Sequence, residues 1–134
     1  MLKQVLLVDD DQAQLSVRQL LLNRVGVVSQ LASGARTALA LLRSSAGQRS
    51  IGAVVTDHLM PDMDGVEFVR ELRSFDAEIP VIVISGLPDA REAYNDFHVH
   101  FLAKPCEPEE FIATVKNALL NEGQPANISV AASR

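Results

Sequence analysis

The sequence predicts an α/β fold in which a five-stranded parallel sheet is covered by helices on both faces. Short, continuously apolar runs alternate along the chain with segments of helical periodicity. Strands that are buried on both faces of a parallel sheet read as such runs. Several of the apolar runs also end directly in a charged or hydroxyl side chain. This alternation indicates a doubly wound domain with right-handed crossover connections.

The amino-terminal part of the chain is predicted to contain a strand, a helix and a second strand. Gln4–Val8 is a short apolar run and forms the first strand. A helix is expected from about Gln12 to Val25, because leucines recur on one face and Gly26 is a typical helix stop. A less apolar strand is predicted over Val27–Ala32. The two strands of such a unit lie parallel to each other.

The middle of the chain repeats this pattern. Arg36–Arg43 is predicted to be a helix, because its Ala and Leu residues fall on one side. Ser44–Gln48 is predicted to be a loop, since Ser and Gly cluster there. Ile51–Thr56 is predicted to be the third strand. A further helix is expected to be capped by Asp64 and to run to about Phe75.

The last part of the chain adds two strands and two helices. The fourth strand is predicted over Ile79–Ser85, and the run Phe101–Ala103 is the fifth. Between them the candidate helix Asp89–Phe97 is only about two turns long. The final helix opens at Glu107-Pro108-Glu109-Glu110, with proline in the first turn and acids near its positive end. It is expected to fade around Leu120–Glu122.

The composition indicates one small domain. The chain has 134 residues, of which 48% are hydrophobic, and this suits a single core. A formal net charge of −5 argues against direct nucleic-acid binding by this segment, because phosphate backbones attract clustered Lys and Arg. Cys106 is the only cysteine, so no internal disulfide can form. We find no signal peptide and no apolar segment long enough to cross a bilayer, and we expect a cytoplasmic protein without membrane contact.

Acidic side chains gather where the predicted strands end. Asp9, Asp10 and Asp11 directly follow the first strand, and Asp57 follows the third. Two carboxylates about 4 Å apart oppose each other by roughly 4 kcal/mol at an effective dielectric constant near 20. A fold accepts that repulsion at a helix start or around a bound cation. Asp11 alone fits a helix N-cap, but a cap does not account for the other acids.

The carboxyl ends of parallel strands meet at one edge of a sheet, where ligands bind in α/β folds. This edge would bring Asp9 and Asp10 close to Asp57, with Ser85 at the end of the fourth strand and Lys104 after the fifth. Carboxylates, a hydroxyl and an ammonium that converge in this way describe a divalent-metal and phosphoryl site.

Four ordered motifs are similar to those of the receiver domain of two-component response regulators, of the chemotaxis-Y-like kind. They are V-D-D, T-D-H-L-M-P-D-M-D-G, V-I-V-I-S-G and L-A-K-P, and they lie between Lys3 and Leu120. The resemblance implies a flavodoxin-like (βα)5 fold and a phosphorylatable signalling switch. A sensor histidine kinase or a phosphotransfer protein would donate the phosphoryl group from a phosphohistidine. Self-phosphorylation and autodephosphorylation would then be its only catalysis, and whether it counts as an enzyme stays open.

By this resemblance Asp57 is the phosphoacceptor and Mg²⁺ is the cofactor. Asp10 would ligate Mg²⁺ directly, Asp9 would hold a coordinated water, and Asp57 would complete the carboxylate ligands. The family's remaining protein ligand is a backbone carbonyl two residues beyond the phosphoacceptor, which in this chain belongs to Leu59. A shift of one residue, to Asp10 and Asp11, is the alternative assignment.

The resemblance also assigns roles to the ends of the fourth and fifth strands. Lys104 would pair with the phosphoryl oxygens, and the peptide bond between Lys104 and Pro105 is expected to be cis. Ser85 would hydrogen-bond a phosphoryl oxygen and act as the switch hydroxyl. Phe101 would be the aromatic residue that follows this hydroxyl inward, with an ordinary core phenylalanine as the alternative.

The three histidines have more ordinary interpretations. His58 follows the phosphoacceptor directly, and packing or solvent exposure is the favoured role, ahead of a role as a base. His98 and His100 bracket Val99 and are expected to share one face of the fifth strand. Two histidines at that spacing can chelate a metal, but no third ligand is evident.

The chain departs from the family pattern before Lys104, where the segment that begins after Ser85 is shorter than in most receivers. The missing length falls in the fourth helix, and the residual helix contains Asn95 and Asp96, which are poor helix formers. In many receivers the face formed by the fourth helix, the fifth strand and the fifth helix carries the signal to a partner. We hypothesise that output from this chain to a downstream protein or effector domain uses a different surface, or that this short helix is mobile.

Two other functions suit the same sheet. A phosphohydrolase with an aspartyl nucleophile, of the haloacid-dehalogenase kind, would carry a second acid where this chain has Leu59. A flavodoxin-like cofactor binder would have a phosphate loop rich in Gly, Ser and Thr where this chain has three aspartates. We expect a receiver over residues 1–122. Residues 123–134 would be a disordered tail or the start of a linker in a multidomain regulator or hybrid kinase.

Overall fold

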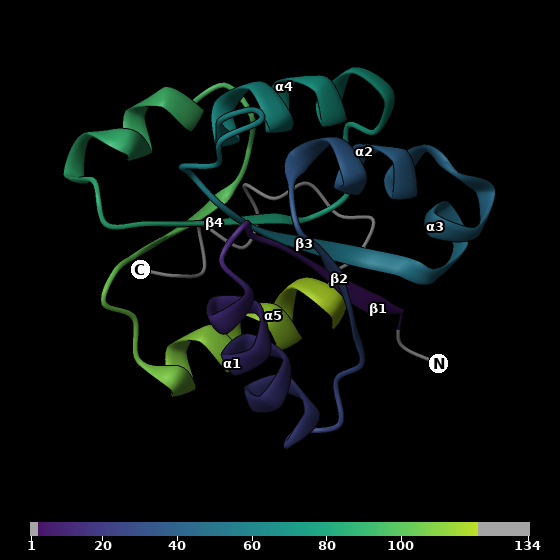
Figure 1. The fold of residues 1–134 in the computed structure, drawn as a ribbon, viewed down its shortest axis with the longest axis vertical. Coiled ribbons are helices and arrows are strands. Elements are labelled where there is room, and N and C mark those ends of the chain that lie inside the picture. Colours follow the sequence, from purple (N-terminus) through teal and green to yellow (C-terminus); the bar gives the residue numbers. More distant parts are fainter. Residues whose placement is uncertain (1–2, 121–134) are drawn as a thin grey trace.

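Five parallel strands form one sheet, as the sequence predicts, and their order is β2-β1-β3-β4-β5 (Figure 1). The structure is a computed structural model that describes residues 3–120, so the tail expected over 123–134 lies outside the described residues. The strands are β1 Gln4–Val8, β2 Ser29–Ala32, β3 Ile51–Asp57, β4 Val81–Ser85 and β5 His100–Ala103. The helices are α1 Gln12–Asn23, α2 Ala35–Arg43, α3 Ser45–Ser50, α4 Gly65–Phe75, the 3₁₀ helix η1 Pro88–Tyr94 and α5 Pro108–Leu120.

Two hydrophobic cores lie on opposite faces of the sheet. Successive side chains of a strand point to opposite faces. Leu6 and Val8 of β1 therefore pack in the core that includes α2 and α4, whereas Val5 and Leu7 pack in the core that includes α1 and α5. Figure 1 shows these two pairs of helices on either side of the sheet. Burial on both faces is the reason why the strands read as continuous apolar runs.

The strand register brings the predicted site residues to one edge. Val8 at the end of β1 pairs with Thr56 of β3, and Ser85 at the end of β4 pairs with Ala103 of β5. The residues that directly follow these paired strand ends therefore lie at the same edge of the sheet. From β1 the chain runs to β2 on one side and later to β3 on the other, so the crevice between β1 and β3 is a topological switch point.

The prediction of a loop over Ser44–Gln48 is wrong, because this segment begins the short helix α3. The Ser44 hydroxyl accepts a hydrogen bond from the Gly47 N–H (3.0 Å) and so caps the helix. Gly47 is buried, and a Cβ atom there would lie 1.8 Å from the Leu41 carbonyl oxygen. The Ser and Gly residues that suggested a loop therefore serve as a cap and as a point of close backbone approach.

Helix α1 ends two residues earlier than predicted, at Asn23. Gly26 has φ +81°, and the N–H of Val27 donates to the carbonyl of Leu22 (3.0 Å), so the chain turns sharply before β2.

The connection between β4 and β5 also differs from its prediction. A 3₁₀ helix ends at Tyr94, where a helix over Asp89–Phe97 was expected. β5 begins only at His100, and His98 is exposed with φ 55°, a conformation that is uncommon for residues other than glycine. The prediction that His98 and His100 share a strand face is therefore wrong, because the short connection still has to turn at His98.

Arg73 of α4 holds this short connection in place. Its guanidinium group donates hydrogen bonds to the carbonyl oxygens of Phe97 (3.0 Å) and His98 (3.3 Å). It also donates to the carbonyl oxygens of Asp76 (3.2 Å) and Ile79 (2.8 Å), which precede β4. One side chain thus donates hydrogen bonds to backbone carbonyl oxygens in two connecting segments, where no strand or helix provides a partner for them.

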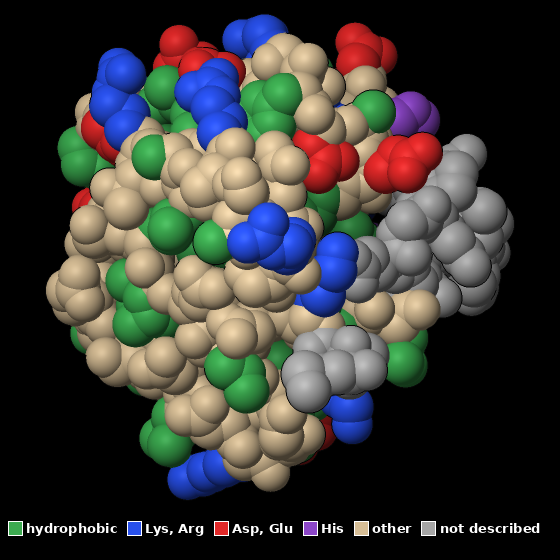
Figure 2. Space-filling model, turned by 90° about the vertical axis from the view of Figure 1, so that its right-hand side faces the viewer, with side chains coloured by type: hydrophobic (Ala, Val, Ile, Leu, Met, Phe, Trp, Pro, Cys, Tyr) green, Lys and Arg blue, Asp and Glu red, His purple; other side chains and the backbone are tan. Residues whose placement is uncertain are grey.

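The side of the molecule on which β1 begins mixes all kinds of side chain (Figure 2). Basic and acidic groups are interspersed with single hydrophobic residues over the part of this face that the structure describes. Among residues 3–120, no helix is long and apolar enough to cross a membrane.

Candidate functional site

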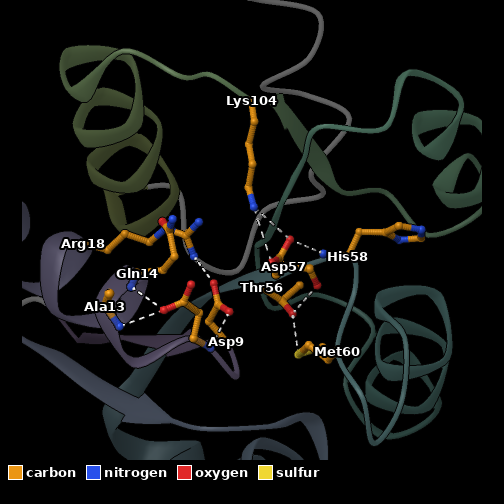
Figure 3. A network of polar contacts seen from close by, with 10 residues as sticks. Asp9, Ala13, Gln14, Arg18, Thr56, Asp57, His58, Met60 and Lys104 are labelled. Carbon is orange, nitrogen blue, oxygen red and sulfur yellow. Dashed lines mark hydrogen bonds and ion pairs between the residues drawn. The ribbon is translucent and has the colours of Figure 1, made fainter.

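Asp57 and Lys104 meet at the carboxyl edge of the sheet, as the sequence predicts (Figure 3). The Lys104 Nζ lies 3.4 Å from Asp57 Oδ1 and 3.5 Å from Oδ2. Asp57 Oδ1 also accepts a hydrogen bond from the backbone N–H of His58 at 2.8 Å. The Asp57 side chain is 15% exposed and that of Lys104 is 37% exposed, so an incoming group can reach both.

The end of β5 positions Lys104. Its backbone N–H donates to the carbonyl oxygen of Ser85 (2.9 Å), which extends the pairing of β4 with β5 by one bond. The peptide bond between Lys104 and Pro105 is cis, which confirms that prediction. The lysine side chain can therefore reach across the edge of the sheet to Asp57.

The three consecutive aspartates have three different environments. Asp9 is fully buried, and its carboxylate accepts from Arg18 Nη1 (3.0 Å) and from the backbone N–H of Asp11 (2.9 Å). Asp10 is exposed at the start of the loop. Asp11 caps α1 by accepting from the N–H groups of Ala13 (2.9 Å) and Gln14 (3.4 Å). Asp11 therefore has the helix-capping role that its position suggested.

Burial raises the pKa of the Asp9 carboxyl above its ordinary value, and the nearby negative charge of Asp57 raises it further. The hydrogen bond from Asp11 and the charges of Arg18 and Lys104 act in the opposite direction without cancelling the rise. This result agrees with our expectation that the crowded acids repel one another. A cation at this edge would relieve that repulsion.

The predicted switch residues occupy the neighbouring strand ends. Ser85 is buried, and its hydroxyl accepts a hydrogen bond from the N–H of Leu87 (3.0 Å). Phe101 of β5 is half-buried, with its ring 6.1 Å from the ring of Tyr94 and the Arg91 guanidinium 4.9 Å above it. Phe101 thus packs against η1, while Ser85 ends β4 just before the loop that leads into η1.

His58 and Tyr94 form a contact that the sequence did not reveal. The Tyr94 hydroxyl lies 2.6 Å from Nδ1 of His58, and its ring is almost completely buried. Figure 3 shows the His58 side chain pointing away from Asp57. Gly65 makes room for the phenol, because a Cβ atom at that position would lie 2.2 Å from the Tyr94 hydroxyl. Tyr94 is the only tyrosine of the chain, and that rarity was the one available signal.

The donors at this edge suit a magnesium ion. Mg²⁺ takes one or two carboxylates from the protein and completes its octahedral shell with waters and substrate oxygens. Asp10 and Asp57 are both accessible, and Leu59 is 59% exposed at the start of the loop that follows β3. Among residues 3–120 no group of three or more His, Cys, Asp and Glu side chains could hold a metal ion. A site of two carboxylates and one backbone carbonyl contains fewer than three such side chains.

Comparison with known proteins identifies the family. A family model described as the response regulator receiver domain matches residues 5–116. The chain therefore belongs to the response regulator receiver domains of two-component signalling, and its five-stranded sheet is the chemotaxis-Y-like form of the flavodoxin-like fold.

Relatives and solved structures agree with this membership. The response regulator protein TmoT of Ectopseudomonas mendocina is 30% identical over 118 residues, which cover 86% of this chain and 52% of that protein. The C4-dicarboxylate transport transcriptional regulatory protein DctD of Pseudomonas aeruginosa is 34% identical over 119 residues, or 87% of this chain and 25% of that protein. The chemotaxis protein CheY4 of Vibrio cholerae superposes with a TM-score of 0.76 at 25% identity, covering 89% of this chain and 100% of that one. The chain spans about half the length of the first curated relatives that it matches.

Proposed function

We propose that this receiver accepts a phosphoryl group on Asp57 in a reaction that requires Mg²⁺, and that it signals through the change that follows. The observation that carries the proposal is the pairing of Lys104 with the accessible Asp57 carboxylate, beside the acids that follow β1. The donor would be a phosphohistidine of a sensor histidine kinase or a phosphotransfer protein.

In the transfer, an Asp57 carboxylate oxygen forms a bond to phosphorus while the bond from phosphorus to the donor's imidazole nitrogen breaks. The electron pair of the broken bond stays on the donor imidazole, which takes up a proton. Lys104 would leave the carboxylate and pair with the new phosphoryl oxygens as a mobile charge. Asp10, Asp57 and the Leu59 carbonyl would hold Mg²⁺, which when bound supplies charge neutralisation at the phosphoryl oxygens.

The signal would begin at Ser85. Its hydroxyl, which accepts from the Leu87 N–H, would turn to donate to a phosphoryl oxygen and release that N–H. Leu87 immediately precedes η1, and Phe101 packs against Tyr94 of η1. A change at Ser85 would therefore reach the short connection directly, and from there it would be passed on to a downstream protein or effector domain.

Intact-mass spectrometry after incubation with a small-molecule phosphodonor tests this function. We expect one phosphoryl adduct that appears with Mg²⁺, is absent with a chelator, and is lost in Asp57→Asn. An adduct of equal yield in the Asp57→Asn protein would contradict the proposal. Steady release of phosphate from a generic phosphate ester would instead favour a phosphohydrolase.

A pair of variants separates the two assignments of the metal ligands. Asp10→Asn should abolish the rise in melting temperature that Mg²⁺ produces, because it removes a direct ligand. Asp11→Asn should keep that rise, since asparagine caps a helix about as well as aspartate. Loss of the rise in Asp11→Asn as well would move the ligands by one residue, to Asp10 and Asp11 together.

A further inference from the structure

Arg18 lies on the buried face of α1, where a hydrophobic residue would be expected. The buried residues of this helix are Leu15, Arg18 and Leu22, at the spacing of one helix face. Its guanidinium reaches Asp9 at the end of β1, with Nη1 3.0 Å from Oδ2. The side chains of Arg18 and Asp9 are 7% and 1% exposed, so this ion pair is removed from solvent.

Burial on this scale requires an explanation. Removing two charges from water is costly, and a buried ion pair seldom stabilises a fold more than hydrophobic side chains of similar size would. Removal of one partner is much worse, because it leaves an uncompensated buried charge. Arg18 is thus poorly explained as a generic stabiliser, and well explained as a fixed partner of a carboxylate that the site needs in its charged form.

Asp9 has few other sources of positive charge in the absence of metal. One of its oxygens accepts from the Asp11 N–H. Lys104 is the other cation that acts on Asp9, but its ammonium is paired with Asp57. Arg18 is the partner that contacts Asp9 itself, from the side of α1 (Figure 3).

We propose that Arg18 is a resident counter-ion of the acidic site, a positioning residue that holds Asp9 when no divalent cation is bound and weakens the affinity for Mg²⁺. The guanidinium and a divalent cation are both attracted to the same acids, and they repel each other. The domain therefore depends less on Mg²⁺ for its stability and binds it less tightly than the acids alone would. This inference rests on the magnesium site of the proposed function.

The test measures Mg²⁺ binding by isothermal titration calorimetry and melting by circular dichroism, without any phosphodonor. In Arg18→Gln we expect the Mg²⁺ dissociation constant to fall roughly tenfold, because one repelling charge next to the site is gone. The melting temperature without Mg²⁺ should fall, and the rise on addition of Mg²⁺ should be larger than in the wild type. Arg18→Lys, which keeps the charge, should bind Mg²⁺ nearly as the wild type does.

Arg24→Gln is the matched control, since it removes the same charge from the exposed end of α1 and should leave Mg²⁺ binding unchanged. A folded Arg18→Gln protein whose affinity equals that of Arg24→Gln would overturn the proposal. If Arg18→Gln is unfolded without metal, recovery of the fold on addition of Mg²⁺ supports the proposal. Failure to fold at saturating Mg²⁺ overturns it, because Arg18 would then serve only the core. The phosphoryl adduct of the wild type tests the proposed function separately.

Discussion

His58 Nδ1 and the Tyr94 hydroxyl lie 2.6 Å apart and join the residue after the phosphoacceptor to the short 3₁₀ helix η1. The backbone N–H of the same histidine donates to Asp57 Oδ1 (2.8 Å), and its carbonyl accepts from the N–H of Gly65 (2.7 Å). His58 therefore ties together the candidate phosphoacceptor, the start of α4 and η1. In this chain the shortened connection is attached to the site by a side-chain hydrogen bond.

Loss of this hydrogen bond should weaken the domain. Tyr94→Phe keeps the buried ring and removes the hydroxyl, so we expect the free energy of unfolding to fall by about 1 kcal/mol. A double-mutant cycle with His58→Ala, measured by urea denaturation, should give a coupling energy of similar size. His98→Ala, an exposed histidine on the same connection, is the control. A coupling energy near zero would mean that the two side chains are neighbours without a stabilising bond.

Gly65→Ala should be among the most costly glycine substitutions in the chain. The new Cβ would lie 2.2 Å from the Tyr94 hydroxyl, so the buried phenol would have to move. We expect a loss of about 1–3 kcal/mol in the free energy of unfolding. Gly86→Ala is the matched control, because its Cβ would meet only Lys104 Cβ at 3.7 Å. Adding Tyr94→Phe to Gly65→Ala should recover part of the loss, and no recovery would show that the clash lies elsewhere.

Arg73→Met should loosen the connection between η1 and β5. The substitution removes the hydrogen bonds to the carbonyls of Phe97, His98, Asp76 and Ile79 and keeps much of the side-chain volume. We expect a loss of roughly 2–4 kcal/mol in stability, together with faster hydrogen exchange around residues 95–99. Arg70→Met is the control on the same helix, where the guanidinium is exposed and lies 5.8 Å from the Phe97 ring. Equal losses in the two variants would argue against a specific role for Arg73.

Asp62 should make stability depend on pH. Burial raises the pKa of this carboxyl, but the N–H groups of Arg36, Ala35 and Asp62 itself outweigh that effect and hold the pKa below its ordinary value. Asp62 Oδ2 accepts from the Arg36 N–H (3.0 Å) and Oδ1 from the Ala35 N–H (3.4 Å), at the start of α2.

Because the folded-state pKa is lowered, the unfolded chain binds more protons and stability rises with pH across this interval. The contribution of Asp62 is complete above the ordinary value of 3.8 and is lost as the pH falls through the folded-state pKa. Urea denaturation should therefore show Asp62→Asn clearly less stable than the wild type at pH 6, with a smaller difference at pH 3. A difference in stability that does not change with pH would show that the charged Asp62 carboxylate does not stabilise the start of α2.

Local sequence patterns determined most of the fold and the position of the site. The apolar runs that end in Asp57, Ser85 and Lys104 are short-range features of the sequence. A strand that is buried on both faces needs apolar side chains at nearly every position, so it can be recognised locally. The parallel order then requires all carboxyl ends to lie on one edge, so the convergence of these residues follows from topology alone. The roles of these residues in phosphoryl transfer remain predictions.

The tertiary structure decided the contacts between residues that no local pattern links. In the sequence Arg18 looks like a solvated helix residue, and only the packing of α1 shows that it contacts Asp9. Tyr94 likewise looks like an ordinary aromatic residue, and only the position of η1 shows that it contacts His58. The helix at Ser44–Gln48 escaped prediction for the same reason, because its glycine is required by an approach to the Leu41 carbonyl. Periodicity reports which face of an element is buried, whereas the partner of a buried polar group depends on how the elements pack against one another.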